Sequence, residues 1–150
     1  MIPAAQRPNW FEVAGVEELS SPCLLLYRAR VEENIRRMLG IAGAAERLRP
    51  HIKTHKIREL VALQRGLGIT KFKCATIAEA EMAANAGASD LLLAYQPVGP
   101  AVRRMAALMQ AYPGVNFSVL ADDPSSITEL SRAIQVVGDK RALAARRVIE

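Results

Sequence analysis

The chain has 150 residues, 51% of them hydrophobic and 23% charged, which excludes a disordered chain, a collagen-like fibre and a coiled coil. Its length predicts one domain, its apolar runs fall short of the roughly 20 residues of a membrane helix, and its start lacks the apolar core of a signal peptide. The net charge is +5, but Lys and Arg are spread among Asp and Glu, so we expect a solvated surface and neither a nucleic-acid nor a membrane partner.

Apolar residues alternate along the chain between the spacing of a buried strand and that of an amphipathic helix. After an irregular arm over residues 1–20, this alternation predicts strands over 23–27, 48–54, 71–75, 90–95 and 115–120, and helices over 31–42, 57–66, 77–86, 100–109 and 124–137. Thr76 and Glu79 have the spacing of a capping box at the start of a helix. Asp123 can cap the last helix, whose first residue is Pro124.

The predicted strands end at similar intervals, at Thr54, Thr76, Gln96 and Ala121. Regular βα units with continuous apolar strands predict a parallel sheet with helices outside it. A (β/α)8 barrel needs about 200–250 residues, so length alone favours a small doubly wound sheet. Where a fifth strand is due, residues 137–150 are basic and helix-like instead.

The two cysteines, Cys23 and Cys74, are too few for a disulfide framework. Both are expected to be buried as small hydrophobic side chains. This cysteine usage predicts a cytoplasmic protein.

Residues 49–56, Arg-Pro-His-Ile-Lys-Thr-His-Lys, are the richest in reactive side chains and contain both histidines of the chain. On a strand, the two histidines and Lys53 would share one face, with the histidines roughly 13 Å apart and too distant to chelate one metal ion. A lysine on the inner face of a parallel strand would be partly desolvated, which lowers its pKa and makes the amine nucleophilic toward a carbonyl or pyridoxal phosphate. From chemistry alone Lys71 and Lys73 are equal candidates, and a solvated surface lysine is the alternative.

The string RPHIKTHK resembles the pyridoxal-lysine segment of D-threonine aldolases and eukaryotic-type D-serine dehydratases, which are fold-type III pyridoxal phosphate enzymes with an alanine-racemase-like N-terminal barrel. Blocks on both sides match in the same order. SSPCLLLYRARVEENIRRM, from Ser20, resembles the entry strand and first helix of the family, and KFKCATIAEAEMAANAGASDLLLAYQPVGP, over 71–100, resembles its second and third βα units. The resemblance runs from about Ser20 to about Ala133.

This resemblance implies an α/β fold with parallel βα repeats, the N-terminal half of a (β/α)8 alanine-racemase-like barrel with one strand–helix unit preceding it. The expected domain organisation is an arm over 1–20, a partial barrel domain over 21–138 and a divergent basic tail over 139–150. Active sites of such barrels lie at the C-terminal ends of the strands.

The resemblance further implies that Lys53 carries pyridoxal 5'-phosphate as an internal aldimine. Thr76 and Gln96 end the next two strands and could line the cofactor ring, although Thr76 could equally be only a helix cap. The implied substrate is a small-molecule D-amino acid, and the implied reaction is that of D-threonine aldolase, which splits a 3-hydroxy-D-amino acid into glycine and an aldehyde. A divalent metal, Mn or Zn, would act as Lewis acid on the β-hydroxyl, and the full-length family implies a homodimer.

The metal ligands of the family, a His and a Cys in a C-terminal β-domain, have no counterpart, because no His follows His55 and no Cys follows Cys74. This departure predicts a truncated enzyme with little activity, which associates through unpaired strand edges. The alternatives are a D-serine dehydratase or amino-acid racemase relative, an inactive remnant, a half-barrel that pairs with another chain, and a small basic module that binds nucleic acid.

Overall fold

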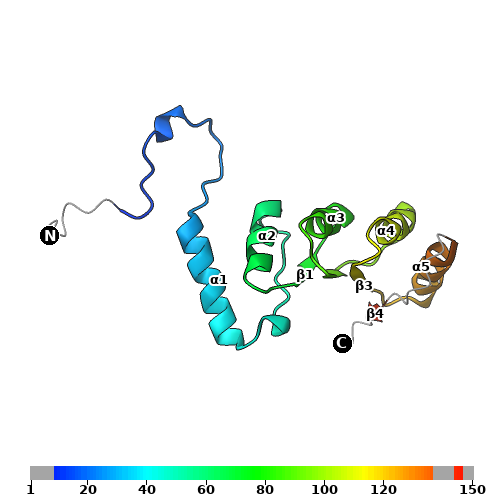
Figure 1. The fold of residues 1–150 in the computed structure, drawn as a ribbon. Helices are drawn as coiled ribbons and strands as arrows, with labels where there is room; N and C mark the ends of the chain where they lie inside the picture. Colours follow the sequence, from blue (N-terminus) through cyan, green and yellow to red (C-terminus); the bar gives the residue numbers. More distant parts are fainter. Residues whose placement is uncertain (1–8, 137–143, 147–150) are drawn as a thin grey trace.

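The computed structural model describes residues 9–136 and 144–146 (Figure 1). Its elements, in chain order, are η2 (Val16–Glu18), α1 (Arg28–Ala42), η3 (Ala45–Arg47), α2 (Arg58–Gly66), β1 (Lys71–Cys74), α3 (Ile77–Asn85), β2 (Asp90–Leu93), α4 (Pro100–Ala111), β3 (Asn116–Leu120), α5 (Pro124–Val136) and β4 (Ala144–Arg146). The predicted alternation of helices and strands is therefore confirmed from α2 to α5.

The strands form one parallel sheet in the sequential order β1-β2-β3-β4. Each helical connection adds the next strand on the same side of the sheet, as in a barrel, whereas a doubly wound sheet reverses its strand order. The doubly wound sheet favoured by length alone is therefore wrong, and the alanine-racemase-like partial barrel agrees with this topology.

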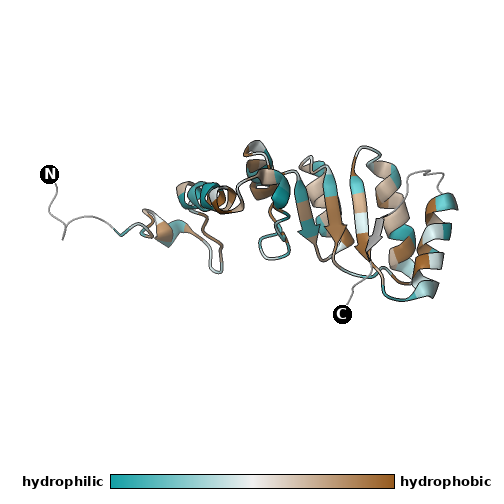
Figure 2. Ribbon diagram, turned by 90° about the horizontal axis from the view of Figure 1, so that it is seen from below, coloured by the Kyte–Doolittle hydropathy of each residue, from teal (hydrophilic) through white to brown (hydrophobic). Residues whose placement is uncertain are grey.

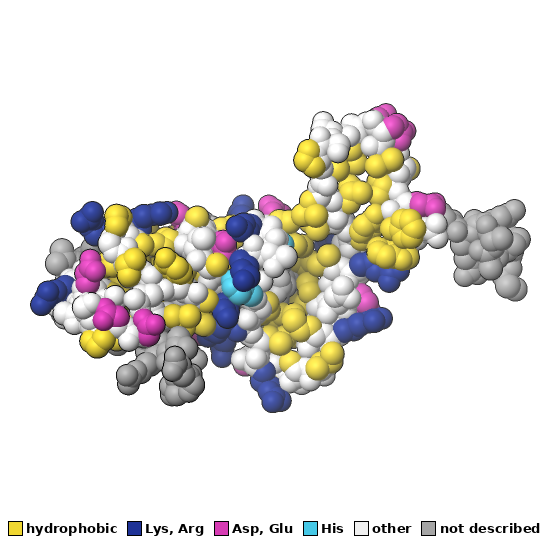
Figure 3. Space-filling view, turned by 180° about the vertical axis from the view of Figure 1, so that it is seen from behind, with side chains coloured by type: hydrophobic (Ala, Val, Ile, Leu, Met, Phe, Trp, Pro, Cys, Tyr) yellow, Lys and Arg dark blue, Asp and Glu magenta, His cyan; other side chains and the backbone are white. Residues whose placement is uncertain are grey.

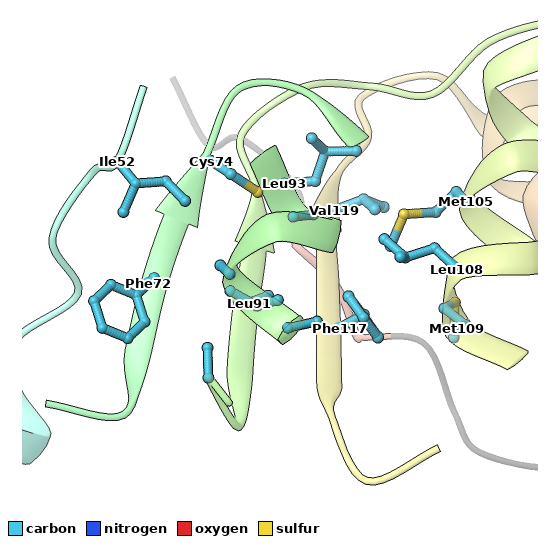
Figure 4. Packing of buried hydrophobic residues seen from close by; sticks show 14 of the residues in the cluster. Ile52, Phe72, Cys74, Leu91, Leu93, Met105, Leu108, Met109, Phe117 and Val119 are labelled. Atoms are coloured by element: carbon cyan, nitrogen blue, oxygen red, sulfur yellow. The ribbon is translucent and has the colours of Figure 1, made fainter. Parts of the chain in front are cut away.

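Helices α2 to α5 stand in a row over one face of the sheet (Figures 1 and 2). In β1 and β2 every second residue is buried on that face, because successive side chains of a strand point to opposite sides. Figure 4 shows this layer meeting α4 through Met105, Leu108 and Met109. The buried hydrophobic residues of β1 to β3 are Phe72, Cys74, Leu91, Leu93, Phe117 and Val119. The core therefore lies between the sheet and its helices.

Side-chain caps define where α3 and α5 begin. The Thr76 Oγ1 accepts the Glu79 amide N–H at 3.1 Å, as the capping-box spacing predicts. The Glu79 carboxylate reaches back to the N–H of Ala75, one residue before the expected partner, at 2.8 Å. The Asp123 carboxylate accepts the Ser126 amide at 2.9 Å, which confirms the predicted cap of α5.

The predicted buried strand over 23–27 is wrong. These residues form no strand, and Leu24, Leu25 and Leu26 are 70%, 38% and 48% exposed. An apolar run becomes a strand only where a neighbouring strand satisfies its backbone groups, and no described residue pairs with this one. Apolar side chains consequently gather on the surface of the arm that precedes α1 (Figure 3).

Two further expectations differ from the structure. Residues 144–146 form β4 and pair in parallel with β3, so the prediction of a helix-like tail is wrong there, and the rest of that prediction, over 137–143 and 147–150, lies outside the described residues. Cys23 is exposed, although Cys74 is buried as predicted. No helix among the described residues is long and apolar enough to cross a membrane.

A half-buried ion pair ties the chain before Lys53 to the sheet. The Arg49 guanidinium donates two hydrogen bonds to the Asp90 carboxylate, at 2.7 and 2.9 Å, and both side chains are about one-fifth exposed, at 21% and 20%. Burial raises the pKa of Asp90, but the hydrogen bonds and charge of Arg49 outweigh it, so the pKa lies below its ordinary value. The pair therefore stabilises the fold in the ionised state of Asp90.

We expect Asp90→Asn to lower the free energy of unfolding by about 2 kcal/mol at pH 7, the order of a hydrogen bond to a charged group. Because the folded-state pKa of Asp90 is lowered, its contribution is present above the unfolded-state pKa of about 4 and is lost as pH falls through the folded-state value. Urea denaturation at pH 7 and near pH 3 measures this. If the variant and the parent differ in free energy of unfolding as much near pH 3 as at pH 7, the predicted role of the ionised Asp90 is contradicted.

Candidate functional site

The strand predicted over 48–54 is reduced to a single bridge. His51 pairs in parallel with Lys73 of β1, and the flanking hydrogen bonds run from the Ile52 N–H to the Lys73 carbonyl and from the Lys73 N–H to the Pro50 carbonyl, both at 2.9 Å. Residues 53–55 then form a turn. Lys53 consequently lies directly after the segment that pairs with β1, at the edge of the sheet where parallel strands end.

The turn uses both histidines as hydrogen-bond acceptors. His51 Nδ1 accepts the Lys53 N–H at 3.2 Å, and His55 Nδ1 accepts the Ile57 N–H at 3.0 Å. Because Nδ1 is the acceptor, the neutral ring of each carries its proton on Nε2. Burial lowers the pKa of both imidazoles, and the charges of Lys53 and Lys73 lower that of His51 further. These lowered pKa values favour the neutral form of both rings at pH 7.

The side chain of Lys53 is exposed, so the predicted partial desolvation of this lysine is wrong among the described residues. The segment turns away from the sheet at residue 53, before a neighbouring strand can cover the side chain. Ile52 is fully buried in the core, and the charges of Lys53 and Lys73 both act on His51. Figure 3 shows a histidine with basic side chains beside it on one face of the molecule.

The other two predicted cofactor residues have structural contacts. Thr76 caps α3 and lines a pocket of about 440 Å³ between α3 and α4, together with Tyr95 and Arg104. The Gln96 amide donates to Ser126 at 3.2 Å and accepts the Asp122 N–H at 2.9 Å. Gln96 thus ties the loop after β2 to the loop after β3. A cofactor contact by Thr76 or Gln96 stays a prediction.

Two further sets of groups bear on the chemistry of this edge. Burial raises the pKa of the Cys74 thiol to about 12, so the thiol is protonated and is not a nucleophile at neutral pH. Within the described part of the chain, no group of three His, Cys, Asp or Glu side chains can hold a metal ion. Lys53 places an exposed amine at this edge.

The sequence pattern indicates Glu79 only as part of a helix cap. In the structure its carboxylate is also 3.4 Å from the Lys56 ammonium in the turn after Lys53. The two residues lie far apart in the sequence on different elements, and no local pattern signals such a pair. Only the docking of α3 beside the turn brings them together.

Relatives with known names match most of this chain. 3-Hydroxy-D-aspartate aldolase of Paracoccus denitrificans is 36% identical over 124 residues, covering 81% of this chain and 32% of the relative. D-threonine aldolase of an Arthrobacter species is 32% identical over 121 residues, covering 80% and 31%. D-threo-3-hydroxyaspartate dehydratase of a Delftia species is 38% identical over 77 residues, covering 51% and 20%. The chain thus spans about one third of the length of the two aldolases.

Solved structures of two proteins are also similar to this chain. D-threonine aldolase from Filomicrobium marinum superposes with a TM-score of 0.76 at 28% identity, covering 87% of this chain and 35% of that chain. An alanine racemase-like protein from Idiomarina loihiensis gives a TM-score of 0.62 at 27% identity, covering 81% and 32%. No protein-family model matches the chain.

Proposed function

We propose, from the premise that this chain is homologous to D-threonine aldolase and 3-hydroxy-D-aspartate aldolase, that it is part of a pyridoxal phosphate-dependent lyase of D-amino acids in which Lys53 holds the cofactor. The observation that carries the proposal is the position of Lys53. It lies in the turn that follows the His51–Lys73 bridge, at the end of a parallel segment, where enzymes built on such barrels keep their active sites.

The residues around this position fit a carbonyl cofactor. The amine of an exposed lysine can attack the aldehyde of a cofactor. Lys53 forms no ion pair within the described residues that would hold its amine back. In their neutral form the rings of His51 and His55, two residues before and after Lys53, carry an Nε2–H donor without adding positive charge. When bound, pyridoxal phosphate withdraws electrons from a bond at Cα of an amino acid.

The substrate class in this proposal is a 3-hydroxy-D-amino acid. One aldolase and the dehydratase are named for 3-hydroxyaspartate in its D form. The other aldolase is named for D-threonine, which also has a hydroxyl group on carbon 3. Aldol cleavage breaks the Cα–Cβ bond to release glycine and an aldehyde, whereas dehydration releases the β-hydroxyl. We favour aldol cleavage, since the two relatives with the greater coverage are aldolases.

The experiment is to incubate the chain, at a concentration high enough to detect the little activity expected of it, with pyridoxal phosphate, Mn²⁺ and D-threonine, and to measure glycine and acetaldehyde. Aldol cleavage yields these two products in equal amounts. Ammonia and 2-oxobutanoate without glycine indicate the dehydratase instead. L-threonine, the mirror image of D-threonine, is the control, because it has the opposite configuration at both carbons of the bond that breaks. Release of glycine from L-threonine as fast as from D-threonine contradicts the proposed substrate class.

A further inference from the structure

Glu79 is a buried carboxylate that the proposed function leaves unused. It comes from the first turn of α3 and is only 4% exposed. One oxygen accepts the N–H of Ala75 at 2.8 Å, and the other is 3.4 Å from the Lys56 ammonium. A charge that is removed from water needs such partners to be tolerated. The carboxylate therefore joins the end of β1 to the turn after Lys53.

The backbone of Lys56 shows why that turn needs a support. Its φ of 51° lies in the left-handed region, which most residue types other than Gly and Asn disfavour. The Lys56 N–H closes the turn by donating to the Ile52 carbonyl at 3.0 Å. Lysine persists in a disfavoured conformation only where its surroundings hold it there, and the contact that holds this side chain is the ion pair with Glu79.

We propose that Glu79 is a positioning residue for Lys53, because its carboxylate holds Lys56 and thereby fixes the turn over 53–56 that presents the Lys53 amine. This inference rests on the proposed function of Lys53. Glu79 acts through Lys56 and touches no reacting atom. A covalently bound cofactor needs its lysine held within a fraction of an ångström, and an exposed turn without this ion pair would sample several conformations.

The first test needs no cofactor. Glu79→Gln keeps an acceptor for the Ala75 N–H but removes the charge that attracts Lys56. Hydrogen exchange of the Lys56 amide should become roughly tenfold faster in this variant, while the amide of Ala94, which donates to Cys74 inside the sheet, stays unchanged. Glu81→Gln, an exposed glutamate of the same helix, is the matched control. Unchanged exchange at Lys56 overturns the inference.

The second test reads the effect at Lys53. Borohydride traps pyridoxal phosphate on lysine, and peptide mapping gives the fraction on Lys53 as the cofactor is titrated. We expect Glu79→Gln and Lys56→Met each to weaken attachment roughly tenfold and the double variant to lose no more than either alone, because both changes break one interaction. Additive losses overturn the pairing. Absence of attachment to Lys53 in the parent chain overturns the proposed function, and the role of Glu79 with it, even if the exchange result holds.

Glu79→Gln/Lys56→Gly separates positioning from helix capping. Glycine adopts a φ of 51° without strain, so the turn no longer needs the ion pair, and attachment to Lys53 should recover most of the loss seen in Glu79→Gln. If Glu79 acted only as the cap of α3, a glycine in the turn would restore nothing. If the double variant attaches the cofactor at Lys53 as weakly as Glu79→Gln does, the inference is contradicted.

Discussion

Lys53→Ala is expected to abolish covalent attachment of pyridoxal phosphate to this chain. The amine of Lys53 forms the proposed bond to the cofactor, and alanine leaves no nucleophile at that position in the turn. Its exposure in the structure also means that alanine creates no cavity in the core, so the fold should be retained. The measurement is the absorbance of the bound cofactor near the visible edge, followed by borohydride trapping and mass spectrometry of the peptides.

Lys73→Ala is the matched control for this experiment. Lys73 pairs with His51 across the bridge, and its charge acts on the His51 imidazole, but Lys73 is not expected to bond to the cofactor. The Lys73→Ala variant should therefore keep the absorbance band, and Lys73 should not take over in the Lys53→Ala variant. A band that survives Lys53→Ala and disappears in Lys73→Ala would falsify the assignment.

Phe72→Ala is expected to lower the free energy of unfolding by about 3–5 kcal/mol. Phe72 is fully buried in the layer between the sheet and its helices, beside Leu91 in the register of β1 and β2 (Figure 4). Alanine removes the ring and leaves a cavity that a strand held on both sides cannot fill by moving. This loss is a large part of the roughly 5–15 kcal/mol by which a typical domain is stable. Urea denaturation followed by circular dichroism measures the loss.

Phe11→Ala provides the control with the same change of side chain. Phe11 lies in the arm and is 53% exposed, so its replacement should cost less than about 1 kcal/mol. Phe72→Leu is the milder change at the buried position and keeps the effect measurable if the alanine variant does not fold. Equal losses at Phe11 and Phe72 would show that the layer between sheet and helices is not the main source of stability.

Most of the secondary structure follows from local sequence. The spacing of apolar residues predicts the helices from α1 to α5 and the strands from β1 to β3, and the caps by Thr76 and Asp123 lie where the residue types require them. These signals work because a helix start and its cap are a few residues apart. The chemical identity of the site residue likewise comes from a short motif around Lys53.

Strand pairing could not be predicted in this way. Residues 23–27 have the composition of a buried strand but form none, and 23–26 are exposed. Residues 144–146, in contrast, pair with β3 although the sequence around them has a helix-like composition. Whether an apolar segment becomes a strand depends on a partner distant in sequence. Length also favoured a doubly wound sheet, and only the observed strand order decides between the two arrangements.

The sequence by itself thus determined the alternation of strands and helices, their caps and the lysine proposed to carry the cofactor. The tertiary structure alone decided that Lys53 lies in a turn and not on a strand, that Gln96 ties two loops, and that Glu79 reaches Lys56. The reason is physical: propensities and caps act between neighbours along the chain, whereas ion pairs, burial and strand order depend on which distant segments the fold brings into contact.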